Sequence, residues 1–215
     1  MTKTISSSLT EQVKHAVAIL RDGGIVAYPT DTIYGLGADI YNDKAVEKVF
    51  EVKNRPMSMP LPVLIDNVQQ LVDLISGQTA FSRALMKRFW PGALTIIFNK
   101  APKFHSLALA GSDKIGVRVP DHPVARLLIR ELGRPIAGTS ANLHTGKITL
   151  TTDEVRAQMG SHVDYIIDAG RCTGGTESTI VDVTTEPPVI LRQGAISENE
   201  IMTEYRDKGG RQSCD

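Results

Sequence analysis

Short apolar runs alternate with helical patterns along this 215-residue chain, and this alternation most constrains the fold. Several neighbouring runs have no helix between them, so the sheet needs antiparallel as well as parallel neighbours. The sequence therefore predicts an α+β fold with a mixed sheet covered by helices. The predicted strands span residues 25–28, 61–65, 94–98, 115–119, 135–138, 165–168, 179–183 and 189–192.

Two capping boxes predict where helices begin. Ser8-Leu-Thr-Glu11 opens a helix that ends at Gly23-Gly24, and Thr151-Thr-Asp-Glu154 opens another. There is no repeat and no linker-like change of composition, so we predict a single domain over residues 9–205, between tails at 1–8 and 206–215. Further helices are predicted at residues 43–52, 68–75, 81–89, 124–132 and 197–205.

The composition excludes several functional classes. The formal net charge is zero, so bulk charge does not mark a nucleic-acid-binding protein, although a locally basic face stays open. The N-terminus lacks an apolar signal core and no apolar run reaches membrane-spanning length, so we expect a cytoplasmic protein. Cys172 and Cys214 are too few for a disulfide framework, and the five scattered histidines predict no metal site.

The segment Tyr28-Pro-Thr-Asp-Thr-Ile-Tyr-Gly-Leu-Gly37 follows an apolar strand pattern. Its hydroxyls, acid and glycines at a strand end are typical of a ligand-binding turn in an α/β protein. Thr30, Asp31 and Thr32 can orient a small polar substrate, or they can form only a local side-chain turn. Both interpretations fit the local sequence.

Lys53 and Arg55 lie two residues apart just beyond a predicted helix. Ammonium and guanidinium groups suit phosphate oxygens, but a basic helix end also complements the helix dipole. The chain has no Walker loop and no dinucleotide fingerprint, so any nucleotide site is built without them.

Two polar segments follow other strands. Thr139-Ser-Ala-Asn142 offers hydroxyls and an amide for a ligand, or a cap for the next segment. Ser178-Thr-Ile-Val-Asp182 is equally compatible with a plain turn into a strand. Ser140 lacks the G-x-S-x-G elbow, which argues against a triad nucleophile.

Arg118 lies inside a strand pattern, and Arg192 ends the last strand pattern. A buried arginine without a partner is costly, so each is expected to hold a carboxylate from the protein or from a ligand.

Taken together, the ordered motifs YPTDTIYGLG, KNRP with PLPVLI, WPG, VRVPDHP, TSAN, STIVD and RQG resemble the YrdC-type threonylcarbamoyl-adenylate synthases. The resemblance extends from Leu9 to Ile196 and fits the short, single-domain form. It implies a three-layer fold with a twisted mixed sheet and a concave, positively charged cavity.

The resemblance implies a nucleotidyltransferase that condenses L-threonine, bicarbonate and ATP into threonylcarbamoyl-AMP and pyrophosphate. The product would serve threonylcarbamoyl-adenosine modification of tRNA by a downstream tRNA threonylcarbamoyl transferase machinery, with contact to tRNA or double-stranded RNA as a further expectation. Mg²⁺ would be bound through the ATP phosphates without a protein metal cage, and no membrane is involved.

The resemblance also assigns site residues. Lys53 and Arg55 would contact the ATP phosphates and act in catalysis. Met59 and Leu64 depart from the asparagine and histidine of the long form. The remaining ATP-binding set would be Lys114, Ser140, Asn142, Thr149 and Arg192, and the threonine-binding set Thr32, Arg118, Gly138 and Ser178.

Two alternative functions remain at this stage. A basic concave surface can serve a non-catalytic module that binds structured or double-stranded RNA by its shape and phosphates. The departures at Met59 and Leu64 also allow a divergent YrdC-like paralogue with another acceptor.

Overall fold

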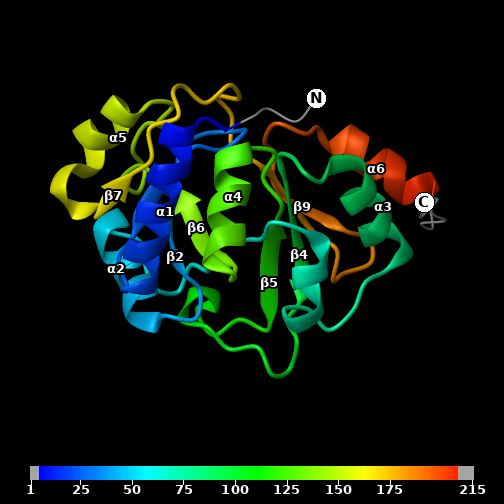
Figure 1. The fold of residues 1–215 in the computed structure, drawn as a ribbon. Coiled ribbons are helices and arrows are strands. Elements are labelled where there is room, and N and C mark those ends of the chain that lie inside the picture. The colour runs from blue at the N-terminus through cyan, green and yellow to red at the C-terminus, as the bar shows by residue number, and fades with distance from the viewer. Residues whose placement is uncertain (1–4, 208–215) are drawn as a thin grey trace.

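In the computed structural model, which describes residues 5–207, one mixed sheet runs through the chain in the order β7-β1-β2-β6-β3-β5-β4-β8-β9 (Figure 1). The pairs β1–β7, β3–β5 and β4–β8 are parallel, and the other neighbours are antiparallel. The predicted mixed sheet is thus confirmed. The strands are β1 Val26–Tyr28, β2 Gly35–Asp39, β3 Val63–Leu64, β4 Leu94–Asn99, β5 Lys114–Arg118, β6 Ile136–Ser140, β7 Tyr165–Ile166, β8 Thr179–Asp182 and β9 Val189–Arg192.

Helices cover both faces of the twisted sheet, which gives three layers. On one face, α1 and α4 pack over apolar side chains of β1 and β6, and Figure 1 shows both helices in front of the sheet. The other face is buried under apolar residues of α2, α3, α5 and α6. The α-helices are α1 Ser7–Arg21, α2 Asp43–Lys53, α3 Ala80–Phe89, α4 Pro123–Leu132, α5 Thr152–Met159 and α6 Glu198–Asp207, and the 3-10 helices are η1 Val68–Asp73, η2 Leu107–Leu109 and η3 Gly160–His162.

Strand β2 was not predicted from the sequence, which indicates only a turn there. Glycine is a weak strand former, and β2 begins Gly-Leu-Gly. The glycines fit because a Cβ on Gly37 would lie 2.4 Å from Cγ2 of Ile136 and 3.1 Å from the Tyr28 hydroxyl oxygen. Close packing of neighbouring side chains against the strand therefore outweighs its low intrinsic propensity.

The predicted start of the first helix is wrong. α1 begins at Ser7, before the predicted domain boundary at residue 9, because Ser6 caps it and accepts a hydrogen bond from the Leu9 amide at 3.3 Å. The capping box of Thr151 and Glu154 is confirmed. Most of the predicted helix at 68–75 is the 3-10 helix η1.

Parts of the two predicted tails lie outside the described residues, namely 1–4 and 208–215, and Cys214 lies among them. Arg206 and Asp207, assigned to the C-terminal tail from the sequence, belong to α6.

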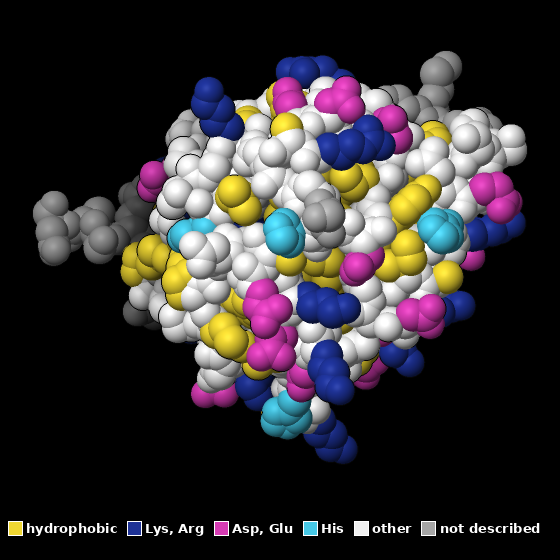
Figure 2. Space-filling model, turned by 90° about the vertical axis from the view of Figure 1, so that its left-hand side faces the viewer, with side chains coloured by type: hydrophobic (Ala, Val, Ile, Leu, Met, Phe, Trp, Pro, Cys, Tyr) yellow, Lys and Arg dark blue, Asp and Glu magenta, His cyan; other side chains and the backbone are white. Residues whose placement is uncertain are grey.

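The face that carries α2, α5 and β7 mixes charges of both signs. Figure 2 shows Lys and Arg side chains interspersed with Asp and Glu over this face. Within residues 5–207, every helix is too short or too polar to cross a membrane.

Candidate functional site

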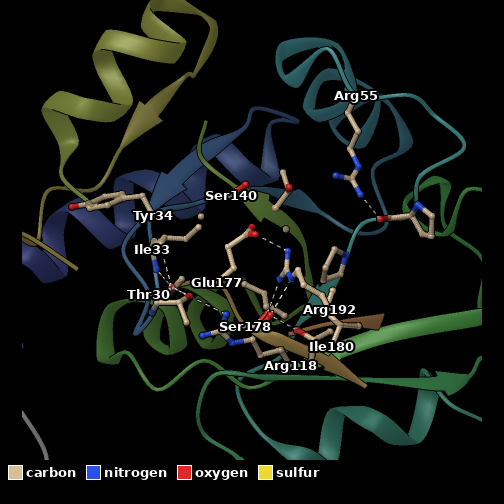
Figure 3. A pocket seen from close by; sticks show the side chains of 18 residues that line it. Thr30, Ile33, Tyr34, Arg55, Arg118, Ser140, Glu177, Ser178, Ile180 and Arg192 are labelled. Atoms are coloured by element: carbon tan, nitrogen blue, oxygen red, sulfur yellow. Dashed lines mark hydrogen bonds and ion pairs between the residues drawn. The ribbon is translucent and has the colours of Figure 1, made fainter. Parts of the chain in front are cut away.

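A cavity of about 180 Å³, open to solvent, is lined by segments that are far apart in the sequence. Arg55, Arg118 and Arg192 all line it, which is the convergence of distant cations that the sequence predicts (Figure 3). The positive charge that the resemblance implies for the cavity stays a prediction, since the lining carries these three guanidinium groups and the carboxylate of Glu177. The full lining is Thr30, Thr32, Ile33, Tyr34, Gly35, Arg55, Pro60, Pro62, Leu64, Thr95, Arg118, Gly138, Thr139, Ser140, Glu177, Ser178, Ile180 and Arg192.

Arg118 ends β5 and is bound by a protein carboxylate. Its Nη2 donates to Oδ1 of Asp31 at 2.6 Å, its Nη1 donates to Oγ1 of Thr32 at 3.1 Å, and its Nε donates to the Gly92 carbonyl at 2.9 Å. Burial lowers the pKa of Arg118, and the adjacent Asp31 opposes this shift. The guanidinium is thus held in one orientation beside the cavity before any ligand arrives.

The β1–β2 turn is organised by Thr30. Its hydroxyl accepts from the amides of Thr32 and Ile33 at 3.1 and 3.2 Å and donates to the Ile33 carbonyl at 2.6 Å. The local side-chain turn is therefore present, and the same Thr30 and Thr32 also line the cavity. The side-chain turn is thus confirmed, and contact of this segment with a substrate stays a prediction.

Arg192 lies across the start of β8. Its Nε donates to the Ser178 carbonyl at 3.0 Å, and its Nη2 donates to the Ser178 hydroxyl at 3.1 Å. That hydroxyl lies 2.9 Å from Oγ1 of Thr95 on β4, and Nη1 of Arg192 forms an ion pair with Glu177 at 3.1 Å. The last strand thus fixes two hydroxyls and one carboxylate along the cavity wall.

Arg55 follows α2 through Asn54, whose left-handed φ of 50° turns the chain away from the helix axis. The Arg55 guanidinium donates to the carbonyls of Met59 and Pro60 at 3.1 and 3.0 Å. Burial and then the charge of Arg192 lower the pKa of Arg55. Arg55 and Arg192 therefore repel each other across the cavity, an arrangement that a bound polyanion would relieve.

Lys53 does not line the cavity, contrary to the expected phosphate contact. Its ammonium donates to the backbone carbonyls of Ser140 and Asn142, both at 2.6 Å, and to Oδ1 of Asn142 at 3.0 Å. Only 2% of Lys53 is exposed, and burial together with the Arg55 charge lowers its pKa to about 8. Here Lys53 holds the segment after β6 in place.

Three other predicted ATP contacts also lie away from the cavity. The Thr149 hydroxyl donates to the Ala141 carbonyl at 2.9 Å, and the Asn142 amide donates to the Gly146 carbonyl at 2.7 Å. Lys114 begins β5, at the opposite end from Arg118, and bonds Asp182 at 2.8 Å. Of the predicted ATP set, the cavity thus brings together Arg55, Ser140 and Arg192.

The predicted threonine set fares differently, because all four of its members line the cavity: Thr32, Arg118, Gly138 and Ser178. Sequence reasoning missed Glu177 and Thr95. Glu177 directly precedes Ser178 in a segment whose other interpretation was a plain turn, so its position beside a candidate residue was the available signal. Thr95 lies within an apolar strand pattern and gave no such signal.

Residues 5–207 contain no group of three or more His, Cys, Asp or Glu side chains placed to hold a metal ion. The cavity instead combines guanidinium groups with hydroxyls from four strands and turns. Such a set suits a ligand with phosphate and carboxylate groups, because guanidinium groups bind both in bidentate fashion.

Comparison with known proteins supports the family resemblance seen in the sequence motifs. The Sua5/YciO/YrdC family model, described as "Telomere recombination", matches residues 18–194. A Bacillus subtilis protein named threonylcarbamoyl-AMP synthase is 42% identical over 191 residues, which cover 88% of this chain and 55% of that protein.

Two solved structures resemble the fold. P. abyssi Sua5 complexed with L-threonine has a TM-score of 0.86 at 37% identity, covering 89% of this chain and 56% of that one. E. coli YciO has a TM-score of 0.77 at 30% identity, covering 86% of this chain and 89% of that one. The chain spans about half the length of the B. subtilis and P. abyssi proteins.

Proposed function

The chain belongs to the Sua5/YciO/YrdC family, and we propose that it condenses L-threonine, bicarbonate and ATP into threonylcarbamoyl-AMP and pyrophosphate. One observation carries the proposal: Arg55, Arg118 and Arg192 line a single cavity together with Ser140 and Ser178. The name of the B. subtilis relative and the threonine bound to P. abyssi Sua5 support the same assignment.

Threonine would lie at the Arg118 end of the cavity. Arg118 is pre-oriented by Asp31 and Thr32, so its unused donors can meet the substrate carboxylate without a further ordering cost. Ser178 and the backbone of Gly138 line the same region and offer polar contacts to the rest of the amino acid.

ATP would place its phosphates between Arg55 and Arg192. Burial and then the charge of Arg192 lower the pKa of Arg55, so a polyanion bound between the two guanidinium groups is attracted by both. Ser140 adds a hydroxyl at the end of β6.

The reaction then needs positioning more than covalent help from the protein. Bicarbonate gives carbon dioxide and a hydroxide that takes one proton from the threonine α-ammonium. The neutral amine attacks the carbon of carbon dioxide, so an N–C bond forms, one C–O π bond breaks, and a second proton leaves the nitrogen to water to give a carbamate. A carbamate oxygen next attacks the α-phosphorus in line, and the bond from that phosphorus to the bridging oxygen breaks to release pyrophosphate. Arg55 and Arg192 would stabilise the charge that develops on the phosphate oxygens.

Mg²⁺ enters this proposal only as part of the nucleotide substrate. The described residues supply one carboxylate to the cavity, Glu177, and no cluster of metal ligands. Magnesium commonly keeps several waters and binds through substrate phosphates, which fits this donor set.

We further propose that the product serves threonylcarbamoyl-adenosine formation in tRNA, through a downstream transferase. Such an enzyme would work in the cytoplasm, where ATP, bicarbonate and tRNA are available. Direct contact of this chain with RNA is a separate part of the proposal.

The purified chain tests the proposal. Pyrophosphate release from ATP should require both threonine and bicarbonate, and Arg118→Ala should abolish this threonine-dependent release. Salt-sensitive RNA binding without any threonine-dependent pyrophosphate would instead favour the non-catalytic RNA-binding alternative.

A further inference from the structure

Glu177 is the one acidic residue among those that line the cavity. Figure 3 shows its side chain rising into the space between Arg192 and Ser140. Its Oε2 pairs with Nη1 of Arg192 at 3.1 Å, whereas its Oε1 makes no hydrogen bond with any residue that the structure describes. One carboxylate oxygen is therefore available to a ligand.

The backbone of Glu177 is held firmly. Its carbonyl accepts a hydrogen bond from the amide of Ala195 at 3.0 Å. Gly194 packs directly on this segment, since a Cβ there would lie 2.4 Å from the Glu177 carbonyl oxygen. The carboxylate thus starts from a fixed position, while 37% of its side chain stays exposed.

The charges around Glu177 explain why a carboxylate is needed. Burial and then the charge of Arg192 lower the pKa of Arg55, and the charge of Arg192 also contributes to the lowered pKa of Arg118. A cavity lined by three guanidinium groups attracts the carboxylate of an amino acid but repels its ammonium. A zwitterionic substrate is therefore favoured by an anion on the cavity wall; Asp31 is bound to Arg118 and is not among the lining residues, so Glu177 is the carboxylate placed for this role.

We propose that Glu177 binds the α-ammonium of the amino-acid substrate while Arg118 binds its carboxylate. This inference rests on the proposed function and adds the selection of zwitterionic α-amino acids over acids that lack the amine. Oε1 of Glu177 accepts a hydrogen bond from the ammonium, and Oε2 keeps its ion pair with Arg192, which lies on the proposed nucleotide side of the cavity.

A competing role is that Glu177 only orients Arg192. That role predicts weaker nucleotide binding in a variant, with an unchanged preference among amino-acid analogues. The two roles therefore differ in which affinity falls when the carboxylate is removed, that for the amino acid or that for the nucleotide.

The test is calorimetric titration in the presence of a nonhydrolysable ATP analogue. L-Threonine is compared with (R)-3-hydroxybutanoate, which lacks only the α-amine, on the unchanged chain, on Glu177→Gln and on the control Glu47→Gln. Glu47 lies exposed on α2 and does not line the cavity, so Glu47→Gln makes the same chemical change as Glu177→Gln at a site away from the cavity.

Glu177→Gln should weaken threonine binding roughly 10- to 150-fold, the range for one charge-assisted hydrogen bond. Its affinity for (R)-3-hydroxybutanoate should change little, so the preference for threonine collapses, whereas Glu47→Gln keeps it. A Glu177→Gln variant that retains the preference overturns the inference, even if its affinity for the ATP analogue falls.

Pyrophosphate release by the unchanged chain is measured in parallel. If the unchanged chain releases no threonine-dependent pyrophosphate, the proposed function fails. If release is normal but Glu177→Gln keeps the threonine preference, only the inference about Glu177 fails.

Discussion

The carboxylate of Asp31 holds the guanidinium of Arg118, with 2.6 Å between Oδ1 and Nη2. The same Oδ1 accepts a hydrogen bond from the backbone amide of Asp121 at 3.0 Å. One oxygen atom thus joins the β1–β2 turn to the segment that follows β5. Both side chains are largely withdrawn from water, at 7% exposure for Arg118 and 16% for Asp31.

Replacing Asp31 by asparagine should lower the free energy of unfolding by about 1–3 kcal/mol, because a buried guanidinium loses its counter-ion. Urea denaturation measures the difference. The matched control is Asp153→Asn, which removes an exposed pair with Arg156 and should change stability by less than about 0.5 kcal/mol. Equal losses in the two variants would contradict the prediction.

Arg55→Ala should reduce threonine-dependent pyrophosphate release roughly 30- to 1000-fold, as expected for about 2–4 kcal/mol of lost transition-state stabilisation. Arg83→Ala is a close control, since Arg83 also bonds a backbone carbonyl five residues away but does not line the cavity. Steady-state rates at saturating substrates decide the matter. Similar rates for the two variants would remove Arg55 from the catalytic assignment.

Lys53 makes the stability depend on pH. Its pKa in the folded chain is about 8, below the ordinary value of 10.5, because burial penalises the ammonium. Below pH 8 both the folded and the unfolded chain carry this proton, whereas between 8 and 10.5 the unfolded chain binds it more strongly. The Lys53 contribution to the free energy of unfolding should therefore rise with pH across this window.

The measurement compares urea denaturation of the unchanged chain with that of Lys53→Met at several pH values. The difference in free energy of unfolding should shift in favour of the unchanged chain as the pH rises from 8 towards 10.5, by a few kcal/mol at most. A difference that stays constant, or that shifts the other way, would show that the lysine keeps its proton in the fold.

Tyr28 and Gly138 should be energetically coupled. The Tyr28 hydroxyl is buried without a hydrogen-bond partner among the described residues, and a Cβ on Gly138 would lie 2.8 Å from it. Tyr28→Phe removes the unpaired hydroxyl and should be neutral or stabilising by about 1 kcal/mol. Gly138→Ala should destabilise the unchanged chain more than the Tyr28→Phe chain.

A double-mutant cycle in thermal or urea denaturation measures this coupling, with about 0.5 kcal/mol or more as the expected interaction energy. In the Tyr28→Phe chain, the nearest remaining neighbour of the new methyl group is Leu64, at 3.3 Å. If the effects of the two substitutions on the free energy of unfolding are strictly additive, the Tyr28 hydroxyl is not the reason that position 138 is a glycine.

Much of this architecture follows from local patterns. Apolar runs predict eight of the observed strands. The high free-energy cost of burying an unpaired arginine in a strand correctly predicts a carboxylate partner for Arg118. Strand β2 is not predictable in this way, because its glycines are required by close packing against Tyr28 and Ile136. These two side chains come near β2 only in the folded sheet. Side-chain packing from other strands is absent from a local pattern.

The site is predictable in part for a similar reason. The spacing of Lys53 and Arg55 suggests two cations acting together, but the left-handed Asn54 between them sends them to different surroundings. Lys53 finds four oxygen atoms of Ser140 and Asn142, while Arg55 reaches the cavity. The backbone conformation of Asn54 thus determines which of the two cations reaches the cavity, and the residue types of Lys53 and Arg55 do not predict this.

Arg192 lies on β9, one of the two edge strands, which pairs with β8 alone among the described strands. Edge strands open more readily than central ones in native-state hydrogen exchange. A transient detachment of this single ribbon would withdraw a guanidinium from the cavity and release Glu177 and Ser178, while the helices and central strands stay intact. We therefore expect the pocket to lose Arg192 through local opening of this edge under conditions in which the rest of the molecule is still folded.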